Sequence, residues 1–322
     1  LNYDHVDGSL SVRDWGKTAK KGLAKEPEVI ARHGDFQVIY CRLESEKLLK
    51  TPERAVVNKL LQEHPFALFV FSSNDERLWH FLNVKYDREA ERRRLFRRIT
   101  VGQDERLYTA TERISMLDLD EIGDIEQGIR PLEIQEQHDA AFDVEKVTEE
   151  FFKEYRSVFW KFQNELEGQS DDKAWAHDYA QLFLNRLMFL YFVQRKRWLG
   201  GDPNFLSTFW QAYRASEQPR NTFVSRWLEV LFFEAFNNKK NLLNSNQRAY
   251  LPEEIRKCLW KAPFLNGGLF RPGKKDYKYD DIHISDERFR AIFNFLERYN
   301  FTIDEGGPLD QEIAVDPEMI GK

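Results

Sequence analysis

The sequence predicts an α+β protein, in which an N-terminal α/β sandwich domain precedes an all-α helical bundle. Three observations support this prediction. Runs of β-branched and aromatic residues of strand length lie within residues 36–85. Apolar residues at helical spacing dominate after residue 143. Charge also divides, because residues 1–115 carry 21 Lys and Arg against 18 Asp and Glu, whereas residues 116–322 carry 27 against 36.

The N-terminal elements follow from local signals. Residues 36–43 form a β-branched and aromatic run that predicts a strand. Thr51 and Pro52 suit the cap and the first position of a helix. Residues 66–71 and 78–85 flank a turn-rich segment and predict a β-hairpin. The order strand, helix, strand, strand is typical of an α/β sandwich.

The C-terminal part is organised around residues 175–201, which predict a helix buried on most sides. Polar residues interrupt this stretch, and a membrane span would need roughly 20 mostly apolar residues, so we expect a core helix. Further helices are predicted from residue 147, at 205–213, 223–236 and 253–260, and from Ser285. The acidic stretch between the two parts contains glycines and a proline. We therefore expect a domain at 1–116, a linker at 117–142 and a helical connector domain at 143–322.

Composition excludes several classes of protein. Cys41 and Cys258 are the only cysteines among 322 residues, which excludes a disulfide scaffold and a cysteine-based zinc site. No Gly-rich nucleotide loop occurs, and the histidines never reach metal-ligand spacing. The polar start lacks a signal peptide, so we expect a cytoplasmic protein with no membrane partner. Asp316-Pro317 begins a helix just before the chain stops, so we expect the natural protein to continue.

The densest positive stretch follows the predicted hairpin, with six Lys and Arg residues between Arg88 and Arg98. Such a cluster could hold several phosphates of a DNA duplex. The alternative is a solvated edge strand whose charges pair with nearby acids, among them Glu89 and Glu105. The candidate residues for binding double-stranded DNA are Lys85, Arg92, Arg93, Arg94, Arg97, Arg98 and Arg106.

A Mg²⁺-dependent nuclease would need an acid and then a strand bearing Glu-x-Lys, because carboxylates hold the metal and the lysine orients the attacking water. Asp35 precedes the strand at residues 36–43, but Cys41-Arg42-Leu43 stand where Glu-x-Lys should fall. Mg²⁺ would therefore be a cofactor only if residues beyond the strand fold back. The weak nuclease candidates are Asp35, Glu44, Glu46 and Lys47.

Four phrases in the C-terminal half resemble the region ahead of the methylase domain in type IIG-like restriction–modification proteins. They are LNRLMFLYF at 184–192, PFLNGGLF at 263–270, YNFTIDE at 299–305 and EIAVDPEMIGK at 312–322. The segments 79–85 and 97–102 look more loosely like the N-terminal part of large proteins of this group. The motif positions that carry the resemblance are Asn185, Asn266, Gly267, Gly268, Asn300 and Asp316.

The resemblance implies a restriction-nuclease-like domain and a helical connector ahead of an N6-adenine DNA methyltransferase. The methyltransferase motifs are absent here, so its S-adenosylmethionine would bind a domain after Lys322, and no cofactor is expected in this segment. The leading hypothesis is a DNA-binding part of a restriction–modification or phage-defence protein. The alternatives are a Mg²⁺-dependent endonuclease domain with a degenerate motif, and a non-enzymatic scaffold that contacts other proteins of a defence system.

Overall fold

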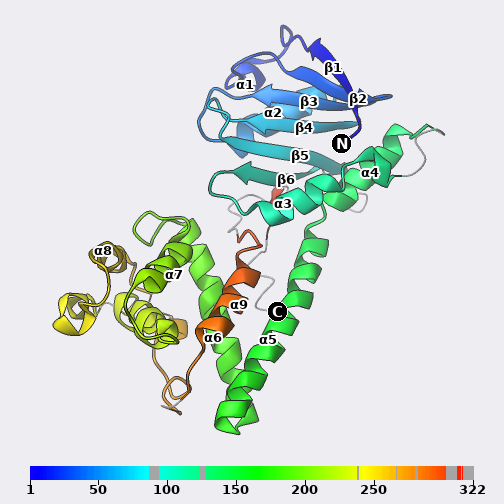
Figure 1. Cartoon of the computed structure of the whole chain (residues 1–322). Coiled ribbons are helices and arrows are strands. Elements are labelled where there is room, and N and C mark those ends of the chain that lie inside the picture. Colours follow the sequence, from blue (N-terminus) through cyan, green and yellow to red (C-terminus); the bar gives the residue numbers. More distant parts are fainter. Residues whose placement is uncertain are drawn as a thin grey trace. The chain divides into compact units, whose positions relative to one another are not determined.

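The computed structural model describes residues 1–86, 94–122, 128–237, 239–265, 267–279, 282–301, 310–312 and 314. The chain divides into two compact units. Unit 1 comprises Leu1–Glu149 and Arg298–Lys322, and unit 2 comprises Glu150–Glu297. Unit 1 contains a mixed sheet with helices, and the described part of unit 2 is helical (Figure 1).

The described residues of unit 1 form one seven-stranded sheet in the order β1 to β7. Most neighbouring strands are antiparallel, whereas β3 pairs with β4, and β6 with β7, in parallel. The predicted hairpin is confirmed as β4 and β5. The strands are β1 (Asp4–Ser9), β2 (Glu28–His33), β3 (Phe36–Arg42), β4 (Ala67–Ser72), β5 (Leu78–Tyr86), β6 (Arg94–Gly102) and β7 (Asp310–Glu312).

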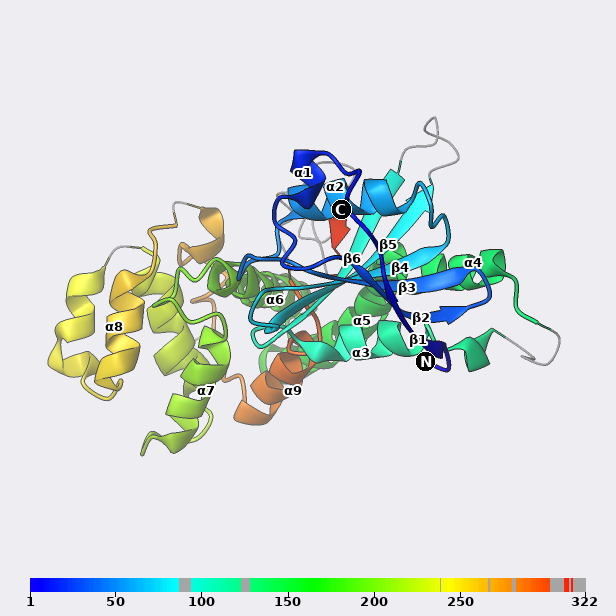
Figure 2. The same cartoon turned by 90° about the horizontal axis from the view of Figure 1, so that it is seen from above.

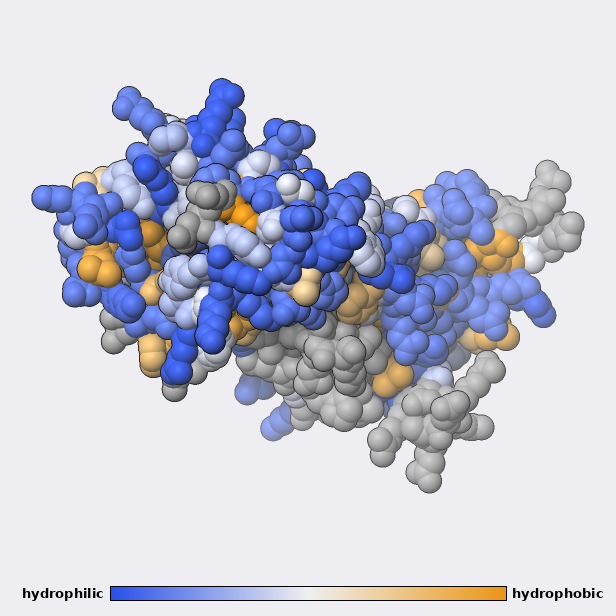
Figure 3. Space-filling view, turned by 90° about the horizontal axis from the view of Figure 1, so that it is seen from below, coloured by the Kyte–Doolittle hydropathy of each residue, from blue (hydrophilic) through white to orange (hydrophobic). Residues whose placement is uncertain are grey.

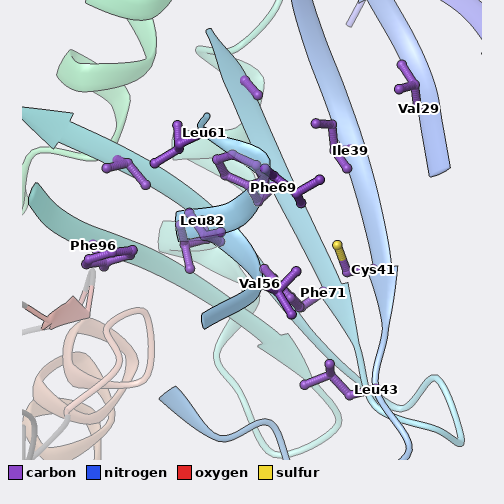
Figure 4. Packing of buried hydrophobic residues seen from close by; sticks show 14 residues of the cluster. Val29, Ile39, Cys41, Leu43, Val56, Leu61, Phe69, Phe71, Leu82 and Phe96 are labelled. Carbon is purple, nitrogen blue, oxygen red and sulfur yellow. The ribbon is translucent and has the colours of Figure 1, made fainter. Parts of the chain in front are cut away.

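Helices cover both faces of this sheet, as Figure 2 shows. The helix α2 (Lys50–Leu60) connects the parallel strands β3 and β4 and packs one face through Val56, Val57 and Leu60. Figure 4 shows that core, with Ile39 and Cys41 of β3 beside Phe69 and Phe71 of β4. The opposite face of the sheet is covered by residues that follow β6 in the chain. The remaining helical elements of unit 1 are α1 (Lys17–Lys20), α3 (Leu107–Ser115), η1 (Leu119–Glu121) and α4 (Pro131–Ala141), while α5 (Val144–Ser170) begins there.

The predicted linker at 117–142 is instead part of unit 1. Leu117, Leu119, Ile134 and Phe142 are buried in the core of the second sheet face. Asp120 and Glu136 of this stretch are exposed, whereas the buried apolar residues pack on the sheet. The predicted connector domain also differs, since residues 310–312 return to pair with β6 in unit 1.

Unit 2 contains the predicted central helix as α6 (Lys173–Arg195), with Asp172 as its cap: the Asp172 carboxylate accepts from the Trp175 amide at 3.0 Å. The stretch at 223–236 contains two π-helical segments, a rare form that often occurs at functional sites. The other elements are α7 (Phe205–Ala215), η3 (Phe223–Leu228), η4 (Leu231–Ala235), η5 (Lys240–Asn244), η6 (Asn246–Arg248), α8 (Glu253–Lys261), η7 (Gly268–Phe270) and α9 (Asp286–Leu296).

On the face shown in Figure 3, hydrophilic residues predominate and hydrophobic residues form small, separate patches. Among the described helices, none combines the length and the apolar character needed to cross a bilayer.

Candidate nucleic-acid surface and buried charge clusters

The arginine run does not form one positive surface. Successive residues of a strand point to opposite faces of the sheet, and in β6 Arg98 faces α2 whereas Arg97 faces α4. The Arg98 side chain is 1% exposed, and its Nε donates to Glu53 at 2.8 Å. Arg97 is also buried, and its Nη1 donates to the carbonyl of Asp139 at 3.3 Å. The expectation that both arginines contact DNA is therefore corrected.

Glu53 is the centre of a buried charge cluster. It lies in the first turn of α2, fully buried, and accepts hydrogen bonds from Arg98 of β6 and from the Nδ1 of His80 of β5 at 2.6 Å. Burial opposes ionisation of this carboxyl, but the bonds and charges of His80 and Arg98 outweigh it and lower the pKa of Glu53. The cluster fastens α2 to two strands, β5 and β6.

The other predicted DNA-binding residues are dispersed. Arg106 is buried, and Asn300 holds its backbone through two hydrogen bonds, of 2.9 and 3.1 Å. Arg94 is half-buried, donates to Asn58 at 2.7 Å and lies over the ring of Tyr86. Lys85 is half-buried at the end of β5, and Arg92 and Arg93 lie outside the described residues.

The nuclease candidates are separated by the length of a strand. Asp35 lies in the turn before β3, whereas Glu44, Glu46 and Lys47 follow its other end. With a rise of about 3.3 Å per residue, this strand places Asp35 some 25–30 Å from Glu44. One metal ion cannot bridge that distance. Across the residues that the structure describes, no group of three His, Cys, Asp or Glu could hold a metal.

The positions of the expected Glu-x-Lys motif have structural roles. Cys41 and Leu43 are buried in the core beneath α2, where burial raises the pKa of the Cys41 thiol. Arg42 donates to the carbonyl of Asn74 and forms an ion pair with Glu76 at 3.1 Å. Neither a thiol in an apolar core nor a paired guanidinium can replace the carboxylates that Mg²⁺ requires. These residues do not fit the metal.

Lysines do gather on the surface of unit 1 at the end of β3, together with Glu44. There a pocket of about 630 Å³, here called the lysine pocket, opens between the segment of α1 and the start of α2. Lys17 and Lys21 lie exposed at this pocket, and Lys47 is exposed nearby in the chain. Sequence reasoning missed Lys17 and Lys21 and gave Lys47 only a nuclease role, because these lysines are spread over 31 positions, whereas five arginines fall within residues 92–98. The pocket is lined by Lys17, Lys21, Gly22, Glu44, Ser45, Leu49, Thr51 and Pro52.

Unit 2 contains its own buried ion pair, between Arg186 of α6 and Asp276. Both side chains are almost fully buried, and the two guanidinium nitrogens donate to the two carboxylate oxygens, with 2.5 Å between Nη1 and Oδ1. The Nε of Arg186 donates to the carbonyl of Leu269 at 2.7 Å. This bond joins two of the phrases that carry the family resemblance, LNRLMFLYF and PFLNGGLF. Arg186 therefore brings the two phrases into direct contact within unit 2.

Glu229, between the two π-helical segments, interacts electrostatically with both residues of this pair. Burial and the charge of Asp276 raise the pKa of Glu229 to about 7, while Arg186 opposes the rise. Glu229 lines a pocket of about 230 Å³ together with Lys239, Arg248 and Tyr277. The sequence signal for this site was two acids, Glu229 and Glu234, inside the aromatic stretch at 223–236.

The remaining motif positions are placed as follows. Asn185 is half-buried on α6, and Gly267 and Gly268 lie where η7 begins. Asn300 holds the segment that enters α3, as described above. Asn266 and Asp316 lie outside the described residues.

Comparison with known proteins supports a relationship to restriction–modification proteins. A protein of Methanocaldococcus jannaschii, provisionally named a type II restriction enzyme and methyltransferase, is 26% identical over 210 residues. The match covers 55% of this chain and 16% of the relative, so this chain corresponds to a small part of that protein. No family model matches the sequence. No solved structure matches it either.

Proposed function

We propose that this chain is the N-terminal part of a DNA restriction–modification protein. Unit 1 would be a nuclease-like domain that holds DNA without cleaving it, and unit 2 a helical connector to an adenine-N6 methyltransferase domain. That downstream domain would supply S-adenosylmethionine binding. The observation that carries the proposal is the similarity to the restriction enzyme and methyltransferase of M. jannaschii, which is 26% identical. The joining of two family phrases through Arg186 supports the connector role.

Within this proposal, the lysine pocket replaces the arginine run as the DNA surface of unit 1. Lys17 and Lys21 are exposed and flexible enough to approach a phosphate as point charges. Leu49, Thr51 and Pro52 at the start of α2 line the same pocket, and the apolar side chain of Leu49, which caps this helix, makes no capping bond. Helix N-termini favour anions. Glu44 is the opposing charge, and it limits the pocket to a backbone contact of modest strength.

The test is a salt-dependent filter-binding titration with duplex DNA, comparing the double variant Lys17→Ala/Lys21→Ala with the unaltered chain. We expect weaker binding and a slope of log K against log salt that falls by about 2, because each lost phosphate contact removes about 0.9.

The matched control is Arg77→Ala/Arg130→Ala, which removes two exposed charges of unit 1 outside the pocket. The control should bind as the unaltered chain does. Equal affinity and slope for the lysine variant would exclude this surface, and absence of any binding by the unaltered chain would exclude the DNA role.

A further inference from the structure

Unit 2 has a second positively charged pocket, which lies outside every motif of the sequence. Its volume is about 500 Å³, and it is formed where α7, the turn before η3 and the start of α9 meet. We call it the arginine pocket. Three of its lining residues are arginines, one from each of these segments. The lining residues are Trp210, Arg214, Arg220, Asn221, Asp286, Glu287 and Arg290.

The floor of the arginine pocket is fixed by hydrogen bonds. Asp286, the first residue of α9, accepts from the hydroxyl of Tyr213 at 3.0 Å. Its backbone amide donates to the side chain of Asn221 at 2.9 Å, and Asn221 has the left-handed backbone conformation, with φ 61°. Trp210 packs beneath against Phe223 and other rings. The carboxylate of Asp286 is thus already engaged by the protein.

The charge that remains available is positive. Arg214 lies over the ring of Trp210, and its Nη1 is 3.8 Å from Asp286, which places it on the pocket wall. Arg220 and Arg290 are exposed, and neither forms an ion pair with any residue that the structure describes. Glu287, the second acid of the lining, is exposed. Three guanidinium groups therefore surround a space of about 500 Å³.

We propose that the arginine pocket holds a backbone phosphate of DNA. Guanidinium groups are planar forks that match phosphate oxygens in paired hydrogen bonds, and several of them around one hollow are suited to a phosphate diester. Unit 2, at residues 150–297, carries 23 Lys and Arg against 19 Asp and Glu, so its overall charge does not oppose the approach of a duplex. The proposal rests on the DNA-binding function proposed above and adds a contact on the second unit.

The test uses the double variant Arg220→Ala/Arg290→Ala in the same duplex titration. Arg214 is left unaltered because it contacts Asp286 and Trp210. We expect affinity to fall about threefold to tenfold at moderate salt, and the salt slope to fall by about 1, because one phosphate contact is lost. Arg220→Lys/Arg290→Lys should recover most of the slope but only part of the affinity, since lysine retains charge without the fork.

The control is Lys257→Ala/Lys261→Ala, which removes two charges of α8, a helix that does not line the pocket. This control should bind DNA as the unaltered chain does. If the arginine variant binds normally while Lys17→Ala/Lys21→Ala binds weakly, the arginine pocket is not a DNA contact and the function proposed above stands. If the unaltered chain binds no duplex, both proposals fall.

A second arm distinguishes DNA from a free phosphate ester. ATP is titrated calorimetrically into the unaltered chain and the arginine variant. ATP binding that the variant loses, without any change in DNA affinity, would assign the pocket to a free nucleotide and overturn the proposal. The expected result is that the arginine variant loses DNA affinity and that the unaltered chain shows no measurable ATP binding.

Discussion

The Nε of Arg98 on β6 lies 2.8 Å from a carboxylate oxygen of Glu53 on α2, and both side chains are buried. The densest positive stretch of the sequence, between Arg88 and Arg98, therefore lies partly in the protein core. Burying two charged groups costs their hydration, and the ion pair offsets that cost. Removing one partner leaves the other charge buried without compensation, which destabilises the fold more than replacing both groups by apolar residues. Arg98 is a residue of the core of unit 1.

Replacing Glu53 by Gln should strongly destabilise the chain. Arg98 would keep its charge in the core without a counter-charge, which typically costs about 3–5 kcal/mol. Urea unfolding followed by circular dichroism measures the change. Glu63→Gln, at an exposed acid shortly after α2, is the control and should change stability little. A loss below about 1 kcal/mol for Glu53→Gln would show that the cluster is not the anchor of α2.

Replacing Asn300 by Ala should loosen the start of α3. The Asn300 amide bonds both the N–H and the C=O of buried Arg106, so the variant leaves both backbone groups unsatisfied. Each such group costs about 1–3 kcal/mol. Hydrogen exchange should speed up at residues 106–110 before it does in β3. Unchanged exchange there would contradict the role given to Asn300.

Stability should depend on pH through Glu229. Its pKa of about 7 exceeds the usual value for glutamate, so between these values the folded chain keeps a proton that the unfolded chain has lost. Rising pH therefore destabilises the fold in this window, and the effect is complete above about pH 7. Since the group is partly exposed, the size is on the order of 2 kcal/mol.

The measurement for Glu229 is the urea midpoint of the unaltered chain and of Glu229→Gln between pH 5 and pH 8. Glutamine carries no charge, so the difference between the two chains should grow in favour of Glu229→Gln as pH rises. Parallel pH profiles would show that Glu229 titrates normally.

Magnesium should not stabilise this chain through Asp35. Because β3 separates Asp35 from Glu44, Asp35→Ala should leave the effect of Mg²⁺ on Tm unchanged, and incubation with plasmid and Mg²⁺ should yield no cleavage that depends on Asp35. Cleavage abolished by Asp35→Ala alone would restore the nuclease hypothesis.

Local patterns were sufficient for some elements, although β1, β2, α4 and β7 were not predicted. The strand at 36–43, the hairpin at 66–85 and the central helix at 175–201 correspond to β3, to β4 with β5, and to α6. Each signal lies within a few consecutive residues, as capping, alternation and helical periodicity do. The succession of a sheet part and a helical part follows from the same patterns.

The sequence by itself determined that this chain has a strand-rich beginning and a helical continuation, and it supplied the phrases that resemble restriction–modification proteins. Only the tertiary structure decided which charged side chains are exposed and which are buried or paired. Arg98 meets Glu53 across 45 positions, half-buried Glu229 interacts with the charge of Asp276, and residues 310–312 return to β6. The physical reason is that burial and ion pairing depend on distances in space, which no local pattern of residues specifies.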